Sequence, residues 1–556
     1  LKEGRITEQE IDERVDELLT AALTFPKHSA EEKHKLEGQK ESLYQEHHRL
    51  AGRAAEESMV LLKNEENILP LKAGTRVALI GDFAFSPRYQ GAGSSCVNAI
   101  LVETAAEEIR KTELVLAGAE RGYLRSGKMD KKRETSALKL AGEADVVLFF
   151  LGLGEQEETE GTDRKSINIP QNQLSLLHKI ARVNPAVVAV LSTGSVVGTW
   201  WKKDCRAILH TGLSGEAGAG AVMKILTGAV NPSGKLTESW IWSYEDTPSY
   251  PCYPAKDRTL EYREGIFTGY RYFEKNQIPV SFPFGFGLSY TTFAYRDLQV
   301  ADKGISLKVK NTGTVDGSEI VQMYVALPES KVSRPEKELK GFVKLHLKAG
   351  EEKKVRIPFD DKTFRFFNER SESWEQEEGT YQILAGSSSQ DIRLNGEISL
   401  PGLQVKESGV QMTGETLAKA CEPETLPGAK EQTDSRKQRR TLDRNDPLSD
   451  MRYARNPLAR LIAGSLKKKI EKAEKKGKQP DLNTLFQYNM PFRAIAKMTE
   501  GMVSMKMVDG LLYFVNGHSL KGLGTVISGF LSNQKKNREY EKILCECKSS
   551  DRKEGE

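Results

Sequence analysis

Cysteine is scarce in this sequence. Its 556 residues include six cysteines, of which only Cys545 and Cys547 stand close together. They form neither a disulfide framework nor the spacing of a zinc site, which favours a reducing compartment with free thiols. We therefore expect a cytoplasmic protein. The first residue is leucine, so the true N-terminus need not be present and secretion stays open.

Long apolar runs and a strong net charge are also lacking. No window holds 18 uninterrupted apolar residues, so the sequence predicts no transmembrane segment. A net charge of +4 is small for this length and implies no polyanionic partner. The eight histidines form no ligand pattern, and no metal site is predicted. A chain of this length predicts two to four domains.

The first part of the chain is predicted to form helices, followed by alternating strands and helices. Residues 7–24 place Ile11, Val15 and Leu18 on one helical face, and a second helix is expected from His47 to Leu61. Short apolar strands are expected at 76–81, 113–117, 146–151, 186–191 and 207–210, with helices at 173–181 and 218–226. This alternation predicts a three-layer α/β/α sandwich with a mostly parallel sheet.

A change of rhythm near Tyr290 indicates a second kind of domain. Apolar residues then alternate with period two in strands separated by turns, which predicts an antiparallel β-sandwich. The expected division of the chain is 1–50 for an N-terminal helix and linker, 51–245 for the α/β domain, 246–285 for an inter-domain linker, 286–400 for the β-sandwich, 401–480 for a polar and basic linker, and 481–556 for a helical extension.

The last 156 residues allow more than one interpretation. The Lys/Arg-rich run at 436–478 is read as a solvated face, with a charged helix at 463–476, because no aromatic residues interleave with it as they would in a nucleic-acid site. The apolar stretch at 481–535 predicts a small docked helical appendage. A membrane-surface segment is the alternative, although Asn516, His518 and Lys521 interrupt the apolar run.

Four glutamates fall within six positions, Glu155 to Glu160, directly after an apolar strand that ends at Gly152. Carboxyl groups crowded in this way are expected to raise one another's pKa, and a carboxyl that stays protonated near neutral pH suits a general acid. Ligands of open α/β sheets bind at the carboxyl ends of strands, where this loop lies. A solvated acidic loop is the alternative interpretation.

A glycine-rich loop at 91–95 follows the strand at 76–81. It lacks the lysine of a phosphate-binding loop and the GxGxxG pattern, which disfavours nucleotide binding. Small residues let the backbone and the Ser94 or Ser95 hydroxyl approach another kind of ligand closely, and Arg88 lies just before them.

Five segments together carry a resemblance to a known family. They are Ala55 to Leu71, Arg88 to Ser95, Glu160 to Arg164, Asn231 to Leu236, and Glu264 to Phe293. In this order they resemble glycoside hydrolase family 3, the β-glucosidase and β-xylosidase family, over roughly residues 1–400. The resemblance implies a retaining β-glycosidase built from a (β/α)₈ barrel, an α/β sandwich and a fibronectin type III-like domain.

The resemblance also assigns roles to residues. Glu160 matches the acid/base glutamate of the Glu-Gly-aromatic-Asp-Arg pattern, with Glu158 as the runner-up. Asp163 and Arg164 match the end of that pattern and are expected either to contact sugar or to pair with each other and fix the loop. Arg88, Ser94 and Ser95 are expected on the side of the leaving group. Thr162 replaces the usual aromatic residue, so the packing of this loop against sugar is in doubt.

The family's nucleophile lies on its barrel, and residues 2–15 resemble the helix that closes that barrel. We therefore expect the C-terminal part of a β-glucosidase-like enzyme, inactive alone, acting with its own barrel on oligosaccharides or on aryl or alkyl β-glycosides. The alternatives are a half-enzyme completed by a separate barrel chain and a non-catalytic carbohydrate-binding or scaffold module. No cofactor and no nucleic acid is implied, and a homo-oligomer is an open possibility.

Overall fold

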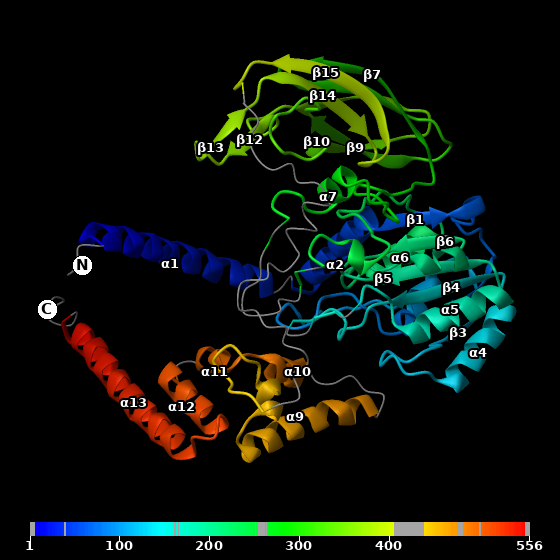
Figure 1. Ribbon diagram of the computed structural model, residues 1–556. Helices are drawn as coiled ribbons and strands as arrows, with labels where there is room; N and C mark the ends of the chain where they lie inside the picture. The colour runs from blue at the N-terminus through cyan, green and yellow to red at the C-terminus, as the bar shows by residue number, and fades with distance from the viewer. Residues whose placement is uncertain are drawn as a thin grey trace.

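The computed structural model describes residues 6–37, 40–160, 163–164, 166–250, 252–253, 262, 264–404, 439–475, 482–499 and 502–550. These residues form an α/β domain, a β-sandwich and a helical unit (Figure 1). The predicted fold class, α/β followed by all-β with a helical C-terminal extension, is confirmed.

A six-stranded sheet forms the centre of the α/β domain, in the order β1-β6-β5-β4-β2-β3. All its strand pairs are parallel except β1 with β6. Every residue of β4 and β5 is buried, which is why these strands read as continuous apolar runs in the sequence. The strands are β1 (Val60–Asn64), β2 (Arg76–Ile80), β3 (Val115–Glu120), β4 (Val146–Gly152), β5 (Val187–Ser192) and β6 (Ala207–His210).

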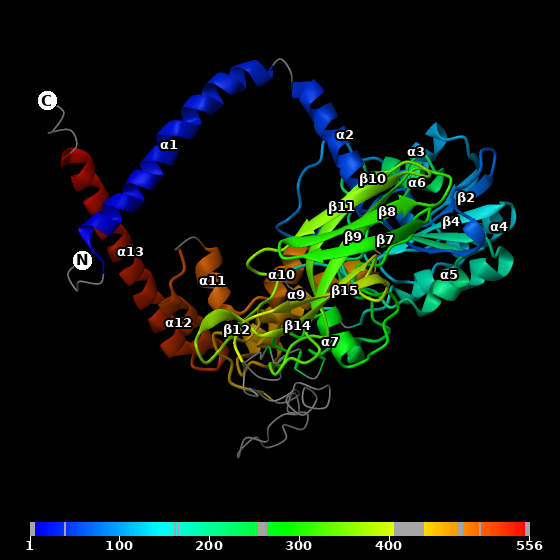
Figure 2. The ribbon, with the colours of Figure 1, turned by 90° about the horizontal axis from the view of Figure 1, so that it is seen from above.

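Helices cover both faces of this sheet. The first group, whose members contact one another, contains α2 (Lys40–Ser58), α3 (Ala105–Glu108) and α6 (Gly218–Leu226). The second contains α4 (Lys131–Gly142) and α5 (Gln171–Val183). Figure 2 shows strands of the sheet between the two groups, as in a three-layer sandwich.

The predicted helix from His47 to Leu61 is wrong at its end. Helix α2 stops at Ser58, and Val60 starts strand β1, which pairs with β6. Leu61 is fully buried. Burial against a strand that lies about 150 positions away overrides the local helical pattern. Before α2, helix α1 (Glu8–Glu37) runs well beyond its predicted end at residue 24.

The β-sandwich has two antiparallel sheets, β10-β9-β14-β15 and β11-β8-β7, and a separate hairpin, β12-β13. Residues of alternating positions, such as Ile305, Leu307 and Val309, fill its core. The strands are β7 (Phe293–Ala301), β8 (Gly304–Asn311), β9 (Gly317–Ala326), β10 (Glu338–Leu347), β11 (Glu352–Pro358), β12 (Arg365–Asn368), β13 (Ser373–Gln376), β14 (Gly379–Gly386) and β15 (Ile392–Leu400).

The segment 246–285, predicted as a linker, contains packed structure. Helix α7 (Tyr270–Lys275) buries Tyr270 and Phe273. The Tyr270 ring stacks on Phe284 at 4.7 Å, and its hydroxyl accepts the Leu339 N–H of the sandwich at 2.8 Å. This segment therefore joins the two domains through buried aromatic rings.

The helical unit starts earlier than the predicted boundary at residue 481. Ala459 and Ala463 lie in the same apolar cluster as Phe492 and Val508, so the predicted charged helix is part of the unit. Residues 405–438 and 476–480 of the predicted linker lie outside the described residues. The helices are α9 (Pro457–Lys475), α10 (Leu482–Asn489), α11 (Phe492–Met498), α12 (Met505–Val515) and α13 (Ser519–Ser550). Across the described residues, no helix is long and apolar enough to cross a membrane.

Candidate active site

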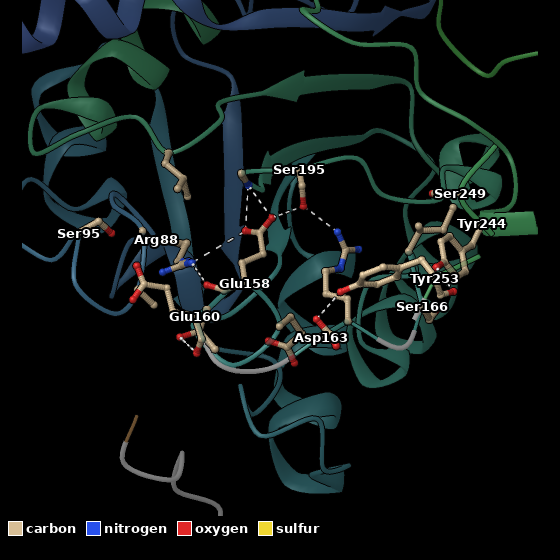
Figure 3. Close-up of a pocket in the computed structure, with 18 residues that line it drawn as sticks. Arg88, Ser95, Glu158, Glu160, Asp163, Ser166, Ser195, Tyr244, Ser249 and Tyr253 are labelled. Carbon is tan, nitrogen blue, oxygen red and sulfur yellow. Dashed lines mark hydrogen bonds and ion pairs between the residues drawn. The ribbon is translucent and has the colours of Figure 1, made fainter. Parts of the chain in front are cut away.

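A cavity of about 790 Å³ opens at the carboxyl ends of β2, β4 and β5. The loops that follow these three strands line it, together with Tyr244, Ser249 and Tyr253 from the segment before α7. Its size lies in the range of small-molecule sites, and its position is the usual ligand position of an open α/β sheet. Figure 3 shows Glu160 and Ser95 on one side of this cavity and the two tyrosines on the other.

The four glutamates of the acidic loop have different surroundings. Glu155 accepts a hydrogen bond from Arg125 at 3.0 Å, and Glu157 accepts the Gly154 N–H at 3.0 Å. Burial raises the pKa of Glu157. These two carboxyl groups therefore stabilise the start of the loop.

Glu158 is held most firmly. Its two carboxylate oxygens accept the Gly194 N–H at 3.0 and 2.9 Å, and one of them accepts the Ser195 hydroxyl at 2.5 Å. The side chain is only 12% exposed, and the buried Arg88 guanidinium lies 4.0 Å away (Figure 3). The acceptor sites of Glu158 are therefore largely used within the protein, by the loop after β5.

Glu160 differs from the other three because its side chain is exposed. Its carboxylate accepts the Ser94 hydroxyl at 2.5 Å, and it lies against Gly93 of the glycine-rich loop. Gly93 has a φ of +96°, and a Cβ there would approach the Glu160 carboxyl carbon to 3.2 Å. The glycine-rich loop thus provides both the hydroxyl that orients Glu160 and the space that its carboxyl occupies.

The two predicted arginines contact the loops as well as lining the cavity. Arg88 donates to the carbonyl oxygens of Gln90 at 2.8 Å and Glu158 at 3.1 Å. Arg164 donates to the Ser195 hydroxyl at 2.7 Å and to the Val196 carbonyl at 3.0 Å. Burial lowers the pKa of Arg164, partly offset by nearby glutamates. Both arginines therefore fix the shape of the cavity wall.

Asp163 accepts the Tyr253 hydroxyl at 2.6 Å, a contact that the sequence did not reveal. This hydrogen bond raises the pKa of Tyr253 to about 12. Asp163 and Arg164 thus bind different partners rather than each other. Thr162 lies outside the described residues.

Sequence reasoning also missed Gly194 and Ser195. The signal was available, since Ser192-Thr-Gly-Ser195 follows an apolar strand at its carboxyl end. Of the predicted substrate-binding residues, Arg88, Ser95, Asp163 and Arg164 line the cavity, and Ser94 binds Glu160 beside it. Direct contact of these five with a substrate stays a prediction.

Comparison with known proteins identifies both domains. Residues 59–290 match the glycosyl hydrolase family 3 C-terminal domain, and residues 319–389 match the fibronectin type III-like domain. The α/β domain and the β-sandwich are therefore of the kinds found in the C-terminal part of glycoside hydrolases. Within this class, the chain belongs to glycoside hydrolase family 3, as the sequence motifs predicted.

Named relatives agree with this assignment. Thermostable β-glucosidase B of Acetivibrio thermocellus is 40% identical over 412 residues, which are 72% of this chain and 53% of the relative. An exo-α-(1→6)-L-arabinopyranosidase of Bifidobacterium breve is 40% identical over 371 residues, 64% of this chain and 49% of the relative. The chain thus spans about half the length of the curated relatives it matches.

Solved structures show the same similarity. The family 3 β-glucosidase of Bifidobacterium adolescentis has a TM-score of 0.62 and 38% identity, covering 66% of this chain and 56% of that one. A β-glucosidase of Kluyveromyces marxianus in complex with glucose has a TM-score of 0.59 and 26% identity, covering 64% and 62%.

Proposed function

We propose that this chain supplies the general acid/base of a retaining exo-β-glycosidase of the β-glucosidase type, and that Glu160 is this group. The observation that carries the proposal is the contrast within the acidic loop. Glu155, Glu157 and Glu158 are bound by protein groups, whereas the Glu160 carboxyl is exposed beside the cavity and is oriented by Ser94.

The chemistry needs a second carboxylate. In a retaining mechanism two carboxyl groups lie about 5–5.5 Å apart, and one attacks the sugar while the other protonates the leaving oxygen. Glu160 then takes a proton from the water that releases the sugar. The nucleophile belongs to a barrel, which is either part of the same protein or a separate chain. The sheets in the described part of this chain include no closed eight-stranded barrel.

The substrate class follows from this arrangement. A terminal β-linked sugar would sit against the barrel, and its leaving group would face the loops of this chain. Oligosaccharides and aryl or alkyl β-glycosides fit such a site. A relative named as a β-glucosidase and one named as an arabinopyranosidase are each 40% identical to this chain over the matched residues. We therefore assign recognition of the sugar itself to the barrel.

The leaving group provides the test. In the complete enzyme, with the barrel supplied in the same chain or as a separate one, Glu160→Gln should lose about 10²–10⁴-fold in kcat/KM, which reports the step that expels the leaving group, on substrates with poor leaving groups. It should lose far less on dinitrophenyl glycosides, which need no proton for departure. Azide should restore turnover of Glu160→Ala and give a glycosyl azide of retained configuration.

The isolated chain gives a second readout. Residues 1–556 alone should not hydrolyse nitrophenyl β-glucoside, because the nucleophile of the proposed mechanism lies on the barrel. Turnover by the isolated chain that disappears in Glu160→Gln would contradict the two-part site. Equal losses of kcat/KM on substrates with good and with poor leaving groups would exclude Glu160 as the acid/base. Glu158→Gln is the matched variant in the same loop.

A further inference from the structure

The helical unit differs sharply from the rest of the chain in charge. Residues 439–550 contain 22 lysines and arginines but only 11 aspartates and glutamates, whereas the whole chain has a net charge of only +4. The rest of the chain is therefore acidic. A positive charge collected on one small unit attracts polyanionic surfaces and raises the rate of encounter with them.

Helix α13 turns an apolar stripe to solvent. Leu520, Leu523, Ile527 and Leu531 are 89%, 58%, 50% and 60% exposed, and their spacing places them on one helical face together with Phe530. Lys535, Lys536 and Arg538 follow within two turns and are exposed. The apolar stripe thus ends in a basic segment.

The packing of α13 fixes the direction of this stripe. Gly522 and Gly529 are buried on the opposite side, and a Cβ at Gly522 would lie 2.7 Å from the Gly510 carbonyl of α12. This close approach of two backbones leaves the leucine face pointing away from the unit. Figures 1 and 2 show α13 at the edge of the unit that is farthest from the six-stranded sheet.

Helix α9 repeats the arrangement. Ala459 and Ala463 are buried in the core of the unit, while Leu458, Leu461 and Ile462 are 52%, 70% and 47% exposed on another side. On the same outward face, one to three turns later, lie three exposed lysines, Lys468, Lys469 and Lys472. Both helices therefore combine an outward apolar face with nearby positive charge.

We propose that this unit binds the surface of an anionic lipid bilayer through the outward faces of α9 and α13. A helix with an apolar face beside lysines lies in the plane of a membrane, with its apolar side chains among the acyl chains and its lysines near anionic headgroups. Association with a second copy would bring together two units of the same sign of charge. Single-stranded nucleic acid would call for aromatic stacking, whereas four of the five stripe residues of α13 are aliphatic.

Vesicle flotation with the full chain tests this inference. The protein should float with vesicles of phosphatidylglycerol and phosphatidylcholine in equal parts, should not float with phosphatidylcholine alone, and should be released by high salt. The triple substitution Leu523→Ser, Ile527→Ser, Leu531→Ser should weaken binding at least about tenfold. Lys468→Gln, Lys469→Gln, Lys472→Gln should weaken it by a similar factor, since each lysine near the surface contributes.

Two variants on the sandwich serve as matched controls. Phe342 is 67% exposed on β10, and Lys354 is exposed on β11. Phe342→Ser and Lys354→Gln should leave flotation unchanged. The altered side chains of the test variants are exposed, so their thermal unfolding should match that of the parent chain. Absence of flotation with anionic vesicles, or flotation unaffected by both triple variants, would overturn the proposal. Binding of the full chain to single-stranded DNA but not to anionic vesicles would also overturn it.

Discussion

Glu158 binds Gly194 through both carboxylate oxygens, at 3.0 and 2.9 Å, and so ties the acidic loop after β4 to the loop after β5. Glu160, two residues later, contacts the glycine-rich loop after β2 instead. Neighbouring glutamates of one loop therefore have separate tasks. Glu158 holds the cavity wall together, and Glu160 presents a carboxyl group to the cavity.

This division predicts that two alanine substitutions in the same loop destabilise the fold to very different extents. Glu158→Ala leaves the Gly194 N–H and the Ser195 hydroxyl without their acceptor and removes a partner of the buried Arg88, which should cost about 3 kcal/mol in the free energy of unfolding. Glu160→Ala, at an exposed side chain, should change it by less than about 0.5 kcal/mol. Chemical denaturation of the two variants measures the difference, and equal destabilisation would contradict it.

Gly93 allows a prediction about the position of Glu160. Gly93→Ala introduces a Cβ that would lie 3.2 Å from the Glu160 carboxyl carbon. It does so at a φ of +96°, which residues other than glycine rarely adopt. We expect a loss of about 1 kcal/mol or more in stability and a displaced Glu160, seen as a shifted carboxyl resonance in NMR spectra. Gly127→Ala, at a φ of +76° with open space around it, is the control for backbone strain alone. It should not move that resonance.

The sheet could be predicted from the sequence because its parallel strands are buried on both faces and read as apolar runs. Strand β1 could not, because Val60 and Leu61 follow a helix directly and form a strand only by pairing with β6. The acidic loop was found for the same local reason, as a cluster of charge after an apolar strand.

The choice between Glu158 and Glu160 needed contacts that are distant in sequence. Glu158 is bound by residues 36 and 37 positions later, and Glu160 by a serine 66 positions earlier. Spacing and composition contain no record of these pairs. The resemblance ranked Glu160 first, and the geometry gives a physical reason for that order, although the acid/base role itself stays a proposal.

His48 predicts a pH dependence of the docking of α2. Its ring nitrogens lie 2.8 Å from Glu216 and 3.1 Å from Glu103. Burial acts to lower the pKa of His48, but the hydrogen bonds and charges of Glu216 and Glu103 outweigh it and raise the pKa above 6.5. The stabilisation by protonated His48 is complete below the pKa that His48 has in the unfolded chain. It is lost as the pH rises through the pKa of His48 in the folded chain.

Hydrogen exchange of the α2 amides, corrected for intrinsic rates, should therefore show stronger protection at about pH 6 than at about pH 8.5. His48→Ala should remove this difference. His47→Ala is the control at the neighbouring position, for which no such change is expected. Protection that is independent of pH in the parent chain would exclude a stabilising ion pair of His48 with Glu216 and Glu103.

His210, the last residue of β6, predicts the opposite pH dependence for the sheet. Its ring lies edge-on to Trp240 at a centroid distance of 4.9 Å, and burial lowers the pKa of His210 to about 4. The unfolded chain, with a histidine pKa near 6.5, then binds a proton before the folded chain does. The contribution of neutral His210 to the free energy of unfolding is therefore present above about pH 6.5 and is lost as the pH falls towards 4, by about 3 kcal/mol.

Denaturation of the parent chain and of His210→Gln between these pH values should show a smaller loss in the variant. His178→Gln alters a half-exposed histidine paired with Asp204 and should retain the loss of the parent chain. If His210→Gln lost as much stability as the parent chain over this range, protonation of His210 would not be the source of the loss.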